Sequence, residues 1–168
     1  MSSAPEFWLR GPVAGIDPVL MPAAHALLQA REDIGHLATT LDEATLWQRP
    51  GGAASAGFHL QHLAGSLDRL FTYARGEALD GRQRDELRSE GTPAPLNDVI
   101  GRVYGTLDRA LDQLRHTPRD ILFDEREVGR AKLPATVLGL LFHGAEHTTR
   151  HVGQLMTTLK VVSGARTP

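Results

Sequence analysis

The chain has 168 residues, no cysteine, and a formal charge of −2 with both signs scattered along it. This length suits one domain with a core of its own, and we predict a single domain over residues 1–168 with core helices over residues 18–162. The absence of cysteine excludes disulfides, thiolate metal sites and a cysteine nucleophile. The balanced charge and an aromatic content of 5% argue against a nucleic-acid partner, which usually needs a basic surface and stacking rings.

The sequence contains no stretch typical of secretion or of membrane insertion. Its beginning, MSSAPEFWLRGP, lacks the apolar core of a signal peptide. No stretch approaches the roughly 18 apolar residues of a membrane span. The longest apolar run, Val137–Phe142, is interrupted by Gly139. We therefore expect a cytoplasmic protein with no membrane partner.

The first half of the chain predicts two amphipathic helices. Asp17 and Pro18 suit the cap and first turn of a helix that continues to about Leu41. A glycine-rich loop follows, and Ser55 is placed to cap a second helix that ends near Gly76. Residues 77–92 are polar and are interpreted as a connection.

The second half predicts two more helices and one ambiguous segment. A third helix spans residues 96–115, and Pro118 prevents its continuation. Within the ambiguous residues 116–132, Ile121–Val128 are either a short strand or part of a long connection. Pro134 suits the first turn of a fourth helix that continues to about Val162. With no convincing strand alternation elsewhere, we predict an all-α four-helix bundle with long crossover connections.

The histidines are grouped on two of the predicted helices. His143, His147 and His151 are each four residues apart on the fourth helix. Histidines at i and i+4 share a helix face and can bind one metal ion, but the outer two lie ~12 Å apart along the axis. One adjacent pair therefore needs a third ligand from elsewhere, and His59 or His62 on the second helix can supply it.

The apolar stripe of each helix indicates which histidines face inward. His151, His147 and His143 lie about 85°, 125° and 165° from the stripe centre of the fourth helix, which favours His147 with His151. On the second helix, His59 lies about 60° and His62 about 120° from the centre, so periodicity favours His59. Three histidines and a water form the open coordination expected of a reactive zinc-type site.

Other interpretations of these residues compete with a metal site. The isolated histidines His25, His36 and His116 are interpreted as structural or solvent-exposed. For the histidine groups of the second and fourth helices, the alternative to a metal site is a chance spacing of structural histidines. Glu146 could act as a general base beside a metal-bound water, but its i, i+4 spacing from Arg150 favours an ordinary ion pair.

The segment from His143 to His147 also matches H-x-x-E-H, a zinc-peptidase signature in which Glu146 would activate water. Such enzymes take a further glutamate ligand from later in the chain. Residues 148–168 contain no Asp or Glu, so a metal-dependent hydrolase is the minor alternative.

Two segments resemble the DinB-like (damage-inducible) four-helix-bundle family of metal-binding proteins. They are LWQRPGGAASAGFHLQHLAGSLDRLFTYARGEAL and EHTTRHVGQL, and the resemblance extends over residues 18–162. It implies the DinB/YfiT-like metalloenzyme fold, with His62, His147 and His151 as the metal ligands. The motif outweighs the periodicity that favoured His59, because a helix touching two neighbours has an imprecise stripe centre. His59 and His143 then lie behind the ligands or at a pocket mouth.

The same resemblance implies a nickel or zinc ion, a homodimer, and the use of a low-molecular-weight thiol. Our first hypothesis is a metal-dependent thiol S-transferase acting on an unknown small-molecule substrate. Arg69 would then meet an anionic substrate, although a surface charge is the simpler interpretation. Our second hypothesis is a non-catalytic metal-binding or stress-associated protein.

Overall fold

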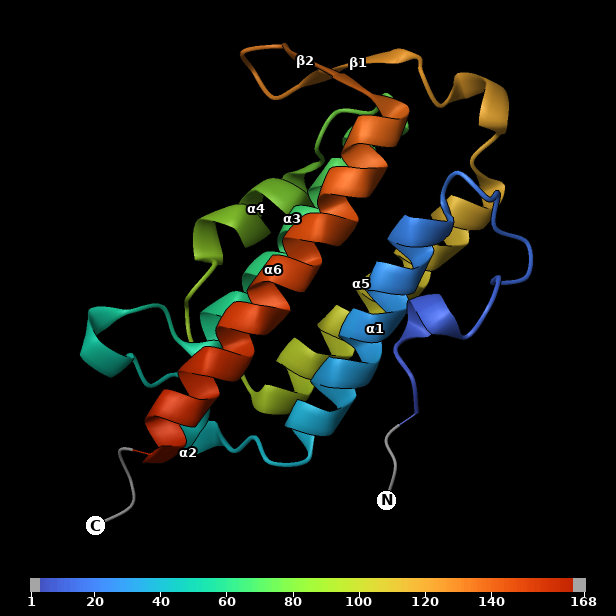
Figure 1. Ribbon diagram of the computed structural model, residues 1–168. Coiled ribbons are helices and arrows are strands. Elements are labelled where there is room, and N and C mark those ends of the chain that lie inside the picture. The colour runs from blue at the N-terminus through green and yellow to red at the C-terminus, as the bar shows by residue number, and fades with distance from the viewer. Residues whose placement is uncertain (1–3, 165–168) are drawn as a thin grey trace.

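The computed structural model describes residues 4–164, and these are mostly helical (Figure 1). Short 3-10 turns occur at Phe7–Leu9, Pro50–Gly52 and Arg119–Ile121. The ends of the predicted domain, residues 1–3 and 165–168, lie outside the described part. The regular elements are α1 (Met21–Ala38), α2 (Glu43–Leu46), α3 (Ala56–Ala74), α4 (Gly81–Ser89), α5 (Leu96–His116), β1 (Glu125–Val128), β2 (Leu133–Thr136) and α6 (Val137–Gly164).

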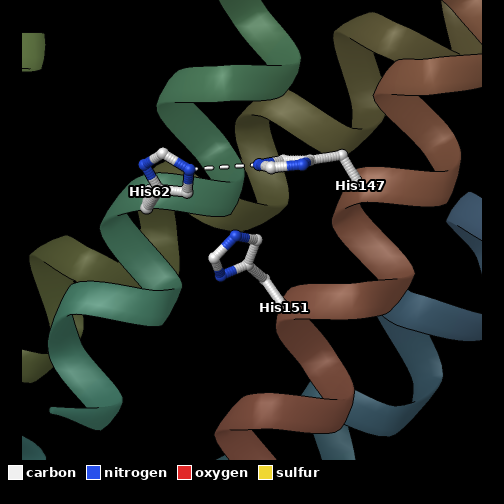
Figure 2. A group of neighbouring side chains, drawn as sticks. All are labelled: His62, His147 and His151. Carbon is white, nitrogen blue, oxygen red and sulfur yellow. Dashed lines mark hydrogen bonds between the residues drawn. The ribbon is translucent and has the colours of Figure 1, made fainter. Parts of the chain in front are cut away.

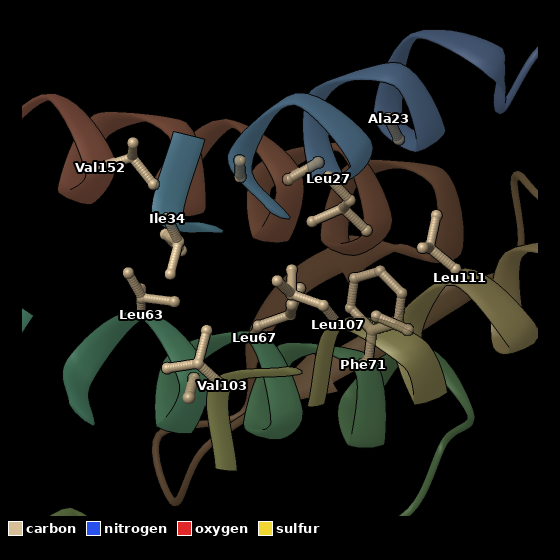
Figure 3. Packing of buried hydrophobic residues seen from close by; sticks show 14 of the residues in the cluster. Ala23, Leu27, Ile34, Leu63, Leu67, Phe71, Val103, Leu107, Leu111 and Val152 are labelled. Atoms are coloured by element: carbon tan, nitrogen blue, oxygen red, sulfur yellow. The ribbon is translucent and has the colours of Figure 1, made fainter. Parts of the chain in front are cut away.

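The four long helices form a bundle, which confirms the predicted fold class. Helix α3 packs against α5 and α6, and α1 packs against the same two helices from the other side. The most extensive of these contacts joins α3 to α6. Figure 3 shows the core between them, where Leu67, Phe71 and Leu107 interdigitate with side chains of the facing helices. Within residues 4–164, no helix has the length and apolar character needed to cross a lipid bilayer.

The first predicted helix is shorter than expected at both ends. It begins at Met21 rather than Pro18, and it ends at Ala38 rather than Leu41. Asp17 accepts a hydrogen bond from the N–H of Val19, which closes a separate turn before the helix. The second helix begins as predicted, since the Ser55 hydroxyl accepts a hydrogen bond from the N–H of Phe58.

The polar connection predicted over residues 77–92 contains a helix, α4. Asp80 and Gln83 form a reciprocal capping box at its start, and Gln83 also donates to Asp68 and Thr72 of α3. The hydrophobic pattern missed this helix because Gln83 is its one buried residue. Helix α4 lies against the flank of α3, outside the four-helix core (Figure 1).

Residues 125–136 form an antiparallel hairpin, so the strand interpretation of the ambiguous segment was the better one. Strand β1 pairs with β2, and Glu127 lies opposite Pro134. The prediction that Pro134 opens the last helix is therefore wrong. Helix α6 begins at Val137 because the Thr136 hydroxyl accepts a hydrogen bond from the N–H of Gly139 and acts as its cap.

A glycine permits the close approach of α6 to α3. A Cβ atom added at Gly144 would lie 2.9 Å from the Cε2 atom of Phe71 and 3.2 Å from the Cδ1 atom of Leu67. A methyl group at this position would therefore force the two helices apart or displace the Phe71 ring. Gly144 lies one turn before His147, so this contact sets the distance across which the histidines face α3.

We predict that Gly144→Ala destabilises the fold by about 1–3 kcal/mol, the usual cost of overpacking a core. Gly153→Ala on the same helix is the matched control, because a Cβ atom there meets no atom of residues 4–164 within 4 Å. The control should gain about 0.5–1 kcal/mol from its better helix propensity. Urea denaturation measures both, and equal stabilities for the two variants would contradict the close contact.

Candidate metal site

Three histidines from two helices point into the space between α3 and α6 (Figure 2). His62 comes from α3, and His147 and His151 come from successive turns of α6. One ring nitrogen from each lies within 4.8 Å of the others. The three residues that the family resemblance singled out are therefore brought together, with His62 rather than His59 completing the group.

The orientation of His62 is fixed from behind by Glu90. Its Nδ1 atom lies 2.6 Å from the Oε2 atom of Glu90. Burial alone would raise the pKa of the Glu90 carboxyl, but hydrogen bonds from His62 and Arg69 outweigh burial and lower the pKa. The carboxylate is then ionised and only accepts, so the hydrogen of the His62 ring must be on Nδ1. In the neutral form of such a ring the other nitrogen, Nε2, has the lone pair, and here it lies 3.1 Å from the Nε2 atom of His147.

Glu90 is in turn held by Arg69. The Arg69 guanidinium donates to the second carboxylate oxygen at 2.8 Å, and the two side chains are 11% and 7% exposed. The interpretation of Arg69 as a surface charge is therefore wrong. Sequence reasoning also missed Glu90, since it stands among neighbouring charges in a polar stretch and nothing in its spacing relates it to His62.

His151 is supported by His59, which is not one of the three. The two side chains are buried, and their Nδ1 atoms lie 3.1 Å apart. The pKa of His151 is lowered to about 4, mainly by burial and to a smaller extent by electrostatic repulsion from the neighbouring imidazoles of His62 and His147. Burial and His62 also lower the pKa of His59. Both rings are thus neutral at pH 7, and one Nδ1 atom donates a hydrogen bond to the other.

The remaining histidines of the fourth helix differ in exposure. Burial and, to a smaller extent, proximity to His62 lower the pKa of His147, and within residues 4–164 its Nδ1 atom has no hydrogen-bond partner. His143 has a side chain 52% exposed, lies 3.5 Å from the Glu146 carboxylate, and is outside the group of three. The Glu146 carboxylate accepts a hydrogen bond from the Arg150 guanidinium, which confirms the ion pair that their spacing predicted. The His143 ring lies beside that of His147, with centroids 5.5 Å apart, but His143 is not part of the group of three and Glu146 is paired with Arg150, so the zinc-peptidase signature gains no support.

The isolated histidines make local contacts. His25 bonds to the carbonyl oxygen of Gly11, and His116 bonds to the carbonyl oxygen of Asp112. Within residues 4–164, neither these two nor His36 belongs to a group of potential metal ligands.

Two cavities within residues 4–164 are lined by none of the three histidines. One, of about 530 Å³, is lined by His59 of α3, by Arg150 and Gln154 of α6, and by the loop residues Ala53 and Ala54. The other, of about 730 Å³, lies between α3, α5 and the start of α4, and its walls carry largely paired charges such as Asp68 and Arg82. The first cavity is connected to the histidine group through His59, which contacts His151.

The three imidazoles fit a divalent transition-metal ion. Imidazole nitrogen is a preferred ligand for zinc, nickel, copper and iron. Two nitrogens bound at about 2.0–2.1 Å in a tetrahedral site are separated by about 3.3 Å. The observed 3.1 Å between the Nε2 atoms of His62 and His147 is close to this separation. Because lone pairs at this distance repel unless a hydrogen or a cation lies between them, the arrangement is one that a shared cation stabilises.

The sequence matches the family model of the DinB superfamily over residues 26–155, which is most of the chain. The protein therefore belongs to the DinB superfamily. No curated protein matches the sequence.

We predict that the metal-free protein loses stability as the pH falls from 6.5 toward 4. In the unfolded chain His151 takes up a proton near its ordinary pKa of 6.5, whereas in the folded chain its pKa is about 4. The unfolded state therefore binds more protons in this window, and His59 and His147 act in the same direction.

Urea denaturation at several pH values, in the presence of a chelator, tests this dependence. His151→Gln should flatten it, while His143→Gln, at an exposed position, should retain the wild-type slope. Equal slopes for wild type and His151→Gln would contradict the assignment.

Proposed function

We propose that His62, His147 and His151 bind one divalent ion, nickel or zinc, and that this site serves a thiol-dependent transfer reaction. The observation that carries the proposal is the convergence of three imidazoles from two helices, with one ring nitrogen of each within 4.8 Å of the others. Three protein ligands leave a coordination position for water or substrate, which distinguishes reactive sites from closed structural ones.

The surroundings of the group favour an accessible site. The His62 side chain is 24% exposed, so the group is open to solvent on the α3 side. The Phe58 ring stacks on His62 with centroids 5.3 Å apart and planes inclined by 10°. Phe58 thereby restricts the rotation of His62 and covers one face of the ring with apolar surface.

A bound divalent ion would lower the pKa of a coordinated thiol and present it as a thiolate nucleophile. The chain has no cysteine, so the thiol must come from a small molecule. The protein's own contribution is to hold neutral imidazoles in place. The small-molecule substrate, the homodimer and the cytoplasmic location remain parts of this proposal.

One observation favours the second candidate function, a non-catalytic metal-binding protein. His59 is a fourth imidazole next to the group; like His151 it is buried, and its Nδ1 atom lies 3.1 Å from that of His151. If His59 turned toward the ion, four protein ligands would close the site. Substitution of His59 therefore discriminates between the two candidates.

We predict that His62→Ala, His147→Ala and His151→Ala abolish stoichiometric binding of Ni²⁺ or Zn²⁺. Their affinity should fall by more than the roughly 10–100-fold typical of losing an outer hydrogen-bond partner. His59→Ala and His143→Ala should retain bound metal. Elemental analysis and calorimetric titration measure these effects. Loss of metal from His59→Ala equal to that from His151→Ala would support the closed, non-catalytic site.

We further predict that the metal-loaded protein transfers a low-molecular-weight thiol to a reactive chlorinated acceptor. Chromatographic detection of the thioether, with glutathione, bacillithiol and mycothiol as donors, measures the reaction. His147→Ala loaded under the same conditions is the control and should be inactive. Absence of product with every donor would contradict the transferase proposal but would leave the metal site intact.

A further inference from the structure

The acidic residue Glu90 stands behind the proposed metal site and is held there by several elements. Its carboxylate receives the Nδ1–H of His62 at 2.6 Å and the Arg69 guanidinium at 2.8 Å. Its side chain is only 7% exposed. A buried carboxylate with two charge-assisted bonds has little freedom to move, so it defines both the tautomer and the direction of the His62 ring.

The backbone that carries Glu90 is fastened to α3. The N–H of Gly91 donates to the Gln61 side chain at 2.7 Å, and the Gln61 amide donates to the carbonyl oxygen of Thr92 at 3.0 Å. Gly91 has a φ of +87°, a conformation that favours glycine. The chain therefore turns sharply after α4 and returns Glu90 to the helix that bears His62.

The other end of α4 is also anchored. Gln83 bonds to Asp68 and Thr72 on α3, and Glu86 receives hydrogen bonds from Arg82 and Arg102. Helix α4 thus contacts α3 at its first turn and through Glu90 just beyond its last turn. This small helix adds little to the hydrophobic core, since Gln83 is its one buried residue.

We infer that Glu90 is the positioning residue of the metal site, with Arg69 orienting its carboxylate and α4 delivering it to His62. The inference rests on the proposed function, because it assigns Glu90 to the support of a metal ligand. A carboxylate behind a ligating histidine fixes the free nitrogen toward the ion and makes it a stronger donor, and its loss typically costs ~10–100-fold in metal affinity. The supports of the ligands then differ, since His62 is held by the Glu90 carboxylate and His151 by the His59 imidazole.

Zinc affinity of the full-length protein, measured by competition with a chromophoric chelator, tests the inference. Glu90→Gln should bind Zn²⁺ about 10–100-fold more weakly than wild type. Glu86→Gln is the matched control, because Glu86 is also a carboxylate of α4 bonded to arginines but contacts no histidine. It should retain wild-type affinity.

Substitution of Co²⁺ for Zn²⁺ reports on the ligands themselves, and its spectrum would not change if Glu90 served only the stability of the fold. The visible absorption bands of Co²⁺ should shift in Glu90→Gln and remain unchanged in Glu86→Gln, while the melting temperatures of the two metal-free variants are compared. An unchanged zinc affinity in Glu90→Gln, or an equal loss in both variants, would overturn the inference while leaving the metal site itself in place.

A measurement on the metal-free wild type guards against misfolding of the variant. Nitrogen-15 NMR at pH 8 should find the His62 ring with its hydrogen on Nδ1, and a hydrogen on Nε2 would overturn the inference. Failure of the wild type to bind Zn²⁺, Ni²⁺ or Co²⁺ would instead remove the proposed function, and the role of Glu90 with it.

Discussion

The close packing of α3 against α6 is the constraint on which the histidine group depends. Gly144 lacks the methyl group that would collide with Phe71 and Leu67, so the two helices approach closely at this level. One turn further along α6, the same short separation lets His147 reach His62. If α3 and α6 were further apart, the imidazoles of His62 and His147 would contact solvent rather than each other. The packing of the apolar core thus sets the geometry of a polar group.

The electrostatics of the group follow from its partial burial. Desolvation lowers the pKa of His59, His147 and His151, so these rings are neutral and offer lone pairs near pH 7. The buried carboxylate of Glu90, which contacts His62, is balanced by Arg69. Negative charge is therefore held behind a ligand rather than presented to the metal. Such an arrangement suits a site that depends on imidazole donors and keeps a coordination position for another molecule.

The sequence predicted the bundle and the approach of the histidines, because both follow from regular spacing. Helical periodicity identified the four long helices, and the i, i+4 spacing of His147 and His151 placed them on one face. Periodicity alone chose His59 over His62, since α3 faces both α5 and α6 and its apolar stripe is broad. Both histidines in fact lie near the group, but only His62 belongs to it.

What the sequence could not predict depends on contacts between distant residues. Helix α4 is nearly all polar, and its stability comes from the Asp80 capping box and from Gln83 bonding to α3. Glu90 lies 28 residues from its partner His62, and no local pattern relates the two. The hairpin displaced the expected start of α6 because both strands of a two-stranded sheet are edge strands, where proline is tolerated.

The first turn of α6 is held by main-chain hydrogen bonds, and this limits which sequence changes the preceding segment can accept. Val137 and Leu138 donate their N–H groups to the carbonyl oxygens of Asp124 and Leu122, which precede the hairpin. Main-chain oxygens are supplied by any amino acid, so exchanges at the exposed Phe123 and Asp124 leave this support unaltered. A change in the length of the segment, however, would carry those oxygens away from the helix. Phe123 and Asp124 therefore tolerate replacement, whereas the segment that contains them does not tolerate insertion or deletion, unlike an ordinary surface loop.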